Sequence, residues 1–266
     1  MNKMNSNRPV GRLPIVLLSL IVAISGIILS QVILRPVPSV EADFWLIHHD
    51  DADRSQRTEA VLRLLEANNT KWAGANLKGV KLSGRQLDIV DLTHANLSES
   101  LLIGTKLAGA TLDHSILDAS DLQEAELTGA SLNEVSLLRC NLNNAKLELT
   151  SFFQASLEQV TANHADFSGA DLSESHCMMA NFTNANLTDA EFDYANLEAT
   201  VFQGAKLTNV NFQGALLLDT DFSNANWWRA IGIETALVED FKNRFAPDAN
   251  APQTLIDDYK AWLKQQ

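Results

Sequence analysis

From Lys71 to Trp227, one residue in every five is large and apolar, in unbroken register for 32 consecutive pentads. A period of five matches neither the roughly 3.6 residues of an α-helix nor the period of two of a free β-strand. Self-similarity at a short, fixed period is typical of a solenoid, so we predict one long repeat. Leu fills 21 of the positions and Phe seven, and the four exceptions are Trp72, Ala162, Cys177 and Trp227.

The positions around each large residue are constrained as well. Two residues before it stands a small residue, usually Ala, and directly before it a polar one, usually Asn or Asp. A polar residue follows directly after the large one, and the next position is often Gly. The repeating unit A-[N/D]-L-x-x resembles the pentapeptide-repeat family, and segments 170–173 and 185–188 match its consensus letter for letter. The resemblance covers about 160 of the 266 residues.

The resemblance implies an all-β solenoid, a right-handed quadrilateral β-helix, and the residue pattern supports this fold physically. The large residue and the small one two positions earlier lie on the same face of an extended chain, so both point inward and fill a narrow bore. Four pentads make a coil of twenty residues, so we expect about eight coils over residues 70–230, with residues twenty apart stacked. This stacking predicts two opposed Phe ladders, one of Phe192 and Phe212, the other of Phe182, Phe202 and Phe222.

The two ends of a solenoid need covers, and the flanking segments suit that role. Residues 55–69 are a predicted amphipathic capping helix at the N-terminal end, and residues 231–266 hold short capping helices for the other end. Residues 35–54 are interpreted as a linker. Cys140 and Cys177 occupy inward positions too far apart along the axis for a disulfide, so we predict two buried thiols.

The N-terminal segment favours attachment to a membrane. Residues 13–34 carry no charge, and 22 residues rich in Leu, Ile and Val are long enough to span a bilayer as a helix. Residues 1–12 contain three basic side chains, whereas acidic ones dominate after Arg35. The positive-inside rule therefore predicts a cytoplasmic N-terminus, a single-pass signal-anchor in the inner membrane and a β-helix in the periplasm or an equivalent space. The alternative is a signal peptide cut after Ala42.

The net charge bears on which partners the chain can bind. After Arg35 the chain has 16 basic and 33 acidic side chains, a formal charge of −17. Such a charge repels nucleic acid and anionic lipid, and it favours solubility or basic partners. We therefore expect no nucleic-acid partner.

A column of three side chains has the composition of a weak metal site. His94, His114 and Glu134 are spaced by twenty residues, so the fold stacks them at one corner, where they can in principle hold zinc. Nothing supplies a fourth ligand, so ordinary polar corner residues are the favoured interpretation. The sequence has no nucleophile–base pairing or phosphate loop, and a filled bore leaves no cleft. We expect neither an enzyme nor a bound cofactor.

Function is then expected on the outer surface, where a few apolar residues interrupt a polar pattern. They gather on the side that carries residues 77, 97 and 117, and we interpret them as a contact surface for a protein partner or a second copy. The alternative is ordinary scattered surface hydrophobes. The predicted surface consists of Ile116, Leu138, Met178, Met179, Leu216 and Leu218.

These features favour a non-enzymatic, membrane-tethered scaffold that displays an acidic rod for protein binding. A related hypothesis is a subunit of a membrane complex, because small residues within the anchor, Ser19, Ser25, Gly26 and Ser30, suit helix packing. The family resemblance implies an alternative, protection or inhibition of DNA gyrase by a rod that imitates duplex DNA. The 20 acidic and 9 basic residues of 70–230 are compatible with mimicry, but a signal-anchor argues against it because gyrase is cytoplasmic.

Overall fold

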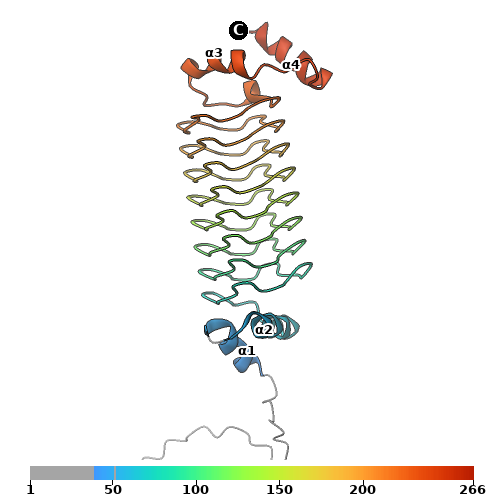
Figure 1. The fold of residues 1–266 in the computed structure, drawn as a ribbon, viewed down its shortest axis with the longest axis vertical. Coiled ribbons are helices and arrows are strands. Elements are labelled where there is room, and N and C mark those ends of the chain that lie inside the picture. Colours follow the sequence, from blue (N-terminus) through green and yellow to red (C-terminus); the bar gives the residue numbers. More distant parts are fainter. Residues whose placement is uncertain (1–38, 51) are drawn as a thin grey trace, which may run out of the picture. The chain divides into compact units, whose positions relative to one another are not determined.

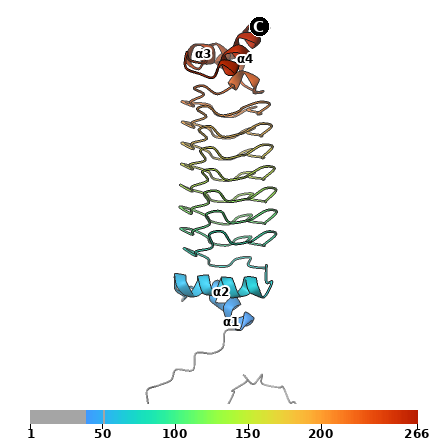
Figure 2. The ribbon, with the colours of Figure 1, turned by 90° about the vertical axis from the view of Figure 1, so that its right-hand side faces the viewer.

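Stacked coils of backbone run along one axis in the part of the chain that the computed structural model describes, residues 39–50 and 52–266 (Figure 1). The predicted anchor 13–34 and tail 1–12 lie outside these residues, among which no helix is long and apolar enough to cross a membrane. Helices lie at both ends of the stack (Figure 2). They are α1 (Val40–His48), α2 (Arg54–Glu66), the 3-10 helix η1 (Trp227–Arg229), α3 (Thr235–Arg244) and α4 (Gln253–Leu263).

Parallel backbone pairing at a step of twenty residues joins each coil to the next. The bridges begin with Lys71 and Asp91, end with Asn211 and Ile231, and recur on all four sides of the coil. Within the described residues each bridge stands alone, so no side becomes a longer strand. A two-residue turn follows each bridged residue up to Asp221 and leaves too few extended residues for a longer strand. The expected β-helix is present, with its sheets reduced to single bridges.

The hydrogen bonds between coils follow one rule along the stack. The amide of Leu97 donates to the Ile116 carbonyl at 2.7 Å, and the amide of Ile116 donates to the Ala95 carbonyl at 2.9 Å. Within the pentad, the amide of Ser100 closes the turn by donating to the Leu97 carbonyl at 3.1 Å. Each coil therefore depends on its neighbours for most of its backbone hydrogen bonds.

From Gly74 to Asn224, the second residue after each large one turns the corner in the left-handed region. At this position φ is 59° at His94, 58° at His114 and 62° at Gly109. Glycine adopts such angles without a Cβ clash, which explains why it recurs at this point of the pentad.

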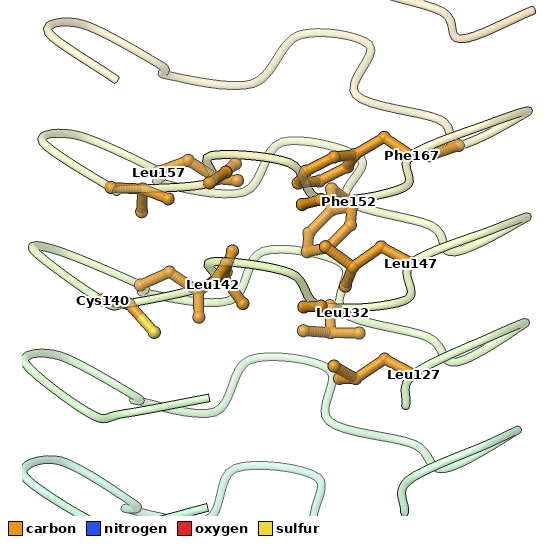
Figure 3. Close-up of a cluster of buried hydrophobic side chains, with 14 of the residues drawn as sticks. Leu127, Leu132, Cys140, Leu142, Leu147, Phe152, Leu157 and Phe167 are labelled. Carbon is orange, nitrogen blue, oxygen red and sulfur yellow. The ribbon is translucent and has the colours of Figure 1, made fainter. Parts of the chain in front are cut away.

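The bore is filled largely as the pentad pattern predicts, although the small inward slots at Arg85 and Ala215 are exposed and half-buried, respectively. The large and small inward residues are almost all buried in one continuous core, and Figure 3 shows Leu127, Leu147 and Phe167 pointing into it. The prediction is wrong at Leu217, which is only half-buried. It lies in the last coil, where no following coil covers its side.

The two predicted Phe ladders are confirmed. Ring centroids of Phe182 and Phe202 lie 5.3 Å apart with an interplanar angle of 9°, and Phe222 continues that ladder at 5.3 Å and 17°. On the opposite side Phe192 and Phe212 stack at 5.8 Å and 25°. Across the bore, Phe192 meets Phe202 edge to face at 5.8 Å and 83°. Both contact geometries are favourable for aromatic pairs.

Helix α1 occupies a segment that the sequence assigned to a linker, residues 35–54, so that assignment is wrong over Val40–His48. Its N-cap is Ser39, whose hydroxyl accepts from the Ala42 amide at 3.1 Å. Its buried carboxylate, Asp43, accepts three hydrogen bonds from the guanidinium of Arg63 in α2 at 2.7 to 3.1 Å. The alternative cleavage point, after Ala42, falls inside this helix.

Helix α2 occupies most of the predicted capping segment 55–69. A capping box starts it, because the Gln56 amide donates to Asp53 Oδ1 and the Asp53 amide donates to Gln56 Oε1, both at 2.9 Å. Val61 and Leu64 are buried in the same core as the coils. The helix therefore covers the N-terminal end of the bore, as a solenoid cap must.

The C-terminal helices cover two sides of the last coil. Phe241 of α3 packs on Phe222 at 5.0 Å between centroids and on Trp227 at 5.5 Å. Trp262 of α4 also packs on Trp227, at 5.4 Å. Neither contact extends to the side that carries Leu217.

Candidate interaction surfaces

Most outward polar residues have a structural role of their own. Asn96 Oδ1 accepts from the amide of Ser98 at 3.0 Å, and Asn186 Nδ2 donates across one coil to Asp166 Oδ1 at 2.9 Å. Burial of Asp166 opposes its ionisation, but hydrogen bonds from Ser168 and Asn186 outweigh it, so its pKa is lowered. These hydrogen bonds hold the turns and stabilise the stacking of neighbouring coils.

The predicted contact surface divides into separate patches. Ile116, Met179, Leu216 and Leu218 are exposed, whereas Leu138 and Met178 are half-buried. The column from Ile116 to Leu216 passes through polar residues at every intermediate coil, namely Ser136, Ser156, His176 and Asn196. The apolar residues of the predicted surface are therefore not contiguous along this side of the coils.

The densest of these patches lies on the uncovered side of the last coil. Leu216 is 60% exposed and Leu218 62% exposed, and the half-buried Leu217 stands between them. We call residues 216–219 the open edge. Three consecutive leucines make it the most apolar part of the predicted surface.

The open edge also ends the backbone ladder. One coil earlier, the amides of Leu197 and Ala199 donate to the carbonyls of Leu216 and Leu218 at 3.0 and 2.9 Å. The equivalent amides of Leu217 and Asp219 donate to no acceptor within residues 39–50 and 52–266. An apolar edge with free amides is a site at which another extended segment can pair.

The predicted corner column is present. The His94 and His114 rings stack with centroids 4.8 Å apart and an interplanar angle of 13°, and His114 Nδ1 lies 3.2 Å from Glu134 Oε2. Among the residues that the structure describes, however, no three His, Cys, Asp or Glu side chains are placed to hold one metal ion. The three side chains therefore contact one another in sequence and do not converge on a common metal position.

The same corner continues beyond the three predicted residues. Gln154 Nε2 donates to Glu174 Oε2 at 2.7 Å. These two line an open groove together with Glu134, His176 and Tyr194. This groove was not predicted, although positions 134, 154, 174 and 194 share the spacing of twenty residues that stacks side chains at one corner.

The cysteine prediction is confirmed. Cys140 and Cys177 are free thiols, fully enclosed in the bore. Burial raises the pKa of each to about 12, although Ser120 and Ser175 hydrogen-bond to them at 3.3 Å and oppose this. The thiolate is the reactive form, so neither residue is suited to nucleophilic chemistry.

Several solved structures of other proteins are similar to this chain at low sequence identity. HetL, a pentapeptide repeat protein involved in heterocyst differentiation regulation from the cyanobacterium Nostoc sp. Strain PCC 7120, is 26% identical, with 65% of this chain and 95% of that chain covered and a TM-score of 0.35. Rfr23, a pentapeptide repeat protein from the cyanobacterium Cyanothece 51142, is 23% identical. The match covers 62% of this chain and 90% of that chain, with a TM-score of 0.24. QnrB1, a plasmid-mediated fluoroquinolone resistance protein, is 20% identical. The match covers 57% of this chain and 77% of that chain, with a TM-score of 0.35.

Curated proteins give no match to the chain. The sequence profile described as "Pentapeptide repeats (8 copies)" does match, over residues 86–123, 120–159, 150–189, 165–204 and 180–217. These overlapping matches fall within the coils that step by twenty residues. Over these residues the chain therefore belongs to the pentapeptide-repeat family, and its coils form a β-helix.

Proposed function

We propose that this chain is a non-enzymatic scaffold, tethered to the inner membrane by residues 13–34, whose β-helix lies outside the cytoplasm and binds a protein. The single observation that carries the binding role is the open edge, with Leu216 60% exposed and Leu218 62% exposed. An uncovered apolar edge promotes aggregation, so a scaffold benefits from a partner that covers it. The uncharged length of 13–34, with basic residues before it, supports the tether.

The chemistry of the edge defines the partner. An extended, apolar segment can lie along residues 216–219 as one further side of a coil. Its carbonyls then accept from the amides of Leu217 and Asp219, and its side chains cover the exposed leucines. A subunit of a membrane complex can supply such a segment, and so can a second copy of this chain, which would give a homodimer.

Site-specific photo-crosslinking in native membranes tests this proposal. A photoreactive side chain at position 218 is expected to form one dominant product, whose mass distinguishes a foreign protein from a second copy. The matched control is position 89, because Ile89 is 76% exposed but lies near the other end of the coils. Equal crosslinking at both positions, or none at 218, contradicts the proposal. A C-terminal reporter fusion tests the topology separately.

The acidic rod favours a second candidate function. Residues 70–230 carry 20 acidic and 9 basic side chains, and a negative rod of this kind can compete with duplex DNA for a DNA-binding enzyme such as gyrase. This function needs the β-helix in the cytoplasm. Inhibition of gyrase supercoiling by the purified chain, together with a cytoplasmic C-terminal reporter, would favour it over the membrane scaffold.

A further inference from the structure

The N-terminal end of the stack exposes a second apolar patch, which follows the predicted anchor by a few residues in the sequence. On α1, Val40 is 45% exposed, Phe44 41% and Trp45 48%, and α1 is the outermost element at this end (Figure 2). The apolar segment ends at Leu34, five residues before the helix cap Ser39. Five residues reach at most about 18 Å, so an anchor over residues 13–34 would tether α1 by a chain no longer than that.

The exposed rings are held in place by their neighbours. Phe44 packs on His48 with centroids 4.2 Å apart, and Trp45 stacks on His49 at 4.0 Å and 18°. His48 Nε2 lies 3.2 Å from the carbonyl oxygen of Ala73 in the first coil. These contacts fix the aromatic rings on the outside of the helix, where they add nothing to the core.

Polar groups surround the patch in a pattern that suits a lipid interface. Val40 and Phe44 line a shallow groove together with Asn68, Asn69 and Lys71. Aromatic rings next to amides and a cation are typical of the zone between acyl chains and head groups.

The charge of the β-helix is distributed unevenly along its length. Residues 39–85 contain seven basic and seven acidic side chains and are electrically balanced. Residues 86–266 contain nine basic and 26 acidic side chains, a net charge of −17. An anionic lipid surface repels the second part but not the first, so only the N-terminal end can approach it closely.

We infer that the N-terminal end of the β-helix rests in the head-group zone of the bilayer through Val40, Phe44 and Trp45, so that the acidic coils stand away from the surface. The inference rests on the proposed anchor, because the anchor brings α1 to the membrane. It also fits the proposed scaffold, since the open edge then lies at the end remote from the lipid.

Trp45 is a built-in reporter for this contact. The five tryptophans of the chain are Trp45, Trp72, Trp227, Trp228 and Trp262. Trp72 is buried in the first coil, and the last three lie at the far end, about 38 Å away for eight coils at the usual strand spacing. Bromine on lipid acyl chains quenches only fluorophores that contact the bilayer, so Trp45 alone should respond.

The experiment reconstitutes the full chain into vesicles of phosphatidylethanolamine and phosphatidylglycerol, with and without brominated acyl chains. Brominated lipid is expected to quench part of the tryptophan fluorescence. Trp45→Phe should abolish the quenching, whereas the control Trp262→Phe should retain it. The double variant Val40→Ser with Phe44→Ser keeps the reporter and should reduce the quenching several-fold.

The outcomes separate this inference from the proposed function. If the chain floats with the vesicles but shows no quenching, or if quenching survives in Trp45→Phe, the inference is overturned while the anchor stands. If the chain does not float with the vesicles, the anchor itself is overturned, and the interfacial contact with it.

Discussion

Gly232 lies against the backbone of Gln213 so closely that a Cβ on residue 232 would stand 2.8 Å from the Gln213 Cα and 2.9 Å from the Phe212 carbonyl carbon. Its φ of 77° also lies in the left-handed region. The preceding residue, Ile231, makes the last bridge of the stack, with Asn211. A side chain at 232 must therefore displace the segment that leads into the C-terminal cap.

Gly232→Ala is expected to destabilise the chain far more than Gly74→Ala does. Gly74 also has a positive φ, of 71°, but nothing lies within 4 Å of the position of its added Cβ. Gly74→Ala should cost about 1–2 kcal/mol from backbone strain alone, whereas overlap at 232 should add about 1–3 kcal/mol. Urea unfolding of both variants measures the difference. If both variants lowered the free energy of unfolding equally, the close approach to Gln213 would contribute nothing to the difference in stability.

The contact between Asp43 and Arg63 should stabilise the N-terminal cap. Asp43→Ala leaves the guanidinium without its buried partner, so we expect a loss of about 1–3 kcal/mol and faster amide exchange in α1. The matched control is Glu59→Ala. Glu59 lies 3.7 Å from the same guanidinium but is largely exposed, so its loss should cost less than about 1 kcal/mol. Similar effects of the two variants would refute a special role for the buried carboxylate.

The period of five residues was enough to predict the core and the stacking. Both depend on side chains repeating in register, which is why the Phe ladders and the His94–His114 pair appear as expected. Contacts outside the repeat were not predictable in this way. Helix α1 depends on a pairing between Asp43 and Arg63, twenty residues apart on separate helices, that no periodic pattern marks.

The open edge was predictable only in part. The sequence marks Leu216 and Leu218 as apolar residues in outward positions. It does not reveal that the C-terminal helices pack on Phe222 and Trp227 and leave Leu217 half-buried, because the placement of a cap depends on tertiary packing. Exposure at the end of a solenoid is therefore a property of the cap rather than of the repeat.

Acid below a pH of about 4 should weaken the attachment of α4. Hydrogen bonding from Arg229 lowers the pKa of the Asp258 carboxyl, although partial burial opposes this, and the Trp228 indole N–H donates to it at 2.8 Å. A carboxyl whose pKa is lowered by folding stabilises the folded state above its ordinary pKa of about 4. That stabilisation is lost as the pH falls from about 4 through the lower pKa that the Asp258 carboxyl has in the folded chain.

The measurement is urea unfolding as a function of pH, with the indole proton of Trp228 followed by NMR. Asp258→Asn cannot ionise, so it should be less stable than the wild type near neutral pH and should lack this part of the acid dependence. If the wild type and Asp258→Asn lose stability in parallel as the pH falls below about 4, other carboxyls control the response.

The register of the repeat is tested most directly by charge in the bore. Leu122 is fully buried in mid-rod, so Leu122→Asp places a carboxylate where no partner can pair with it. We expect a loss of at least about 4 kcal/mol, beyond that of an ordinary cavity, and a large fall in Tm. Leu217→Asp is the matched control, because this central position of the last coil is only half-buried and its carboxylate can reach water. If Leu122→Asp melted like the wild type, or like Leu217→Asp, the inward assignment of the central residues would be wrong.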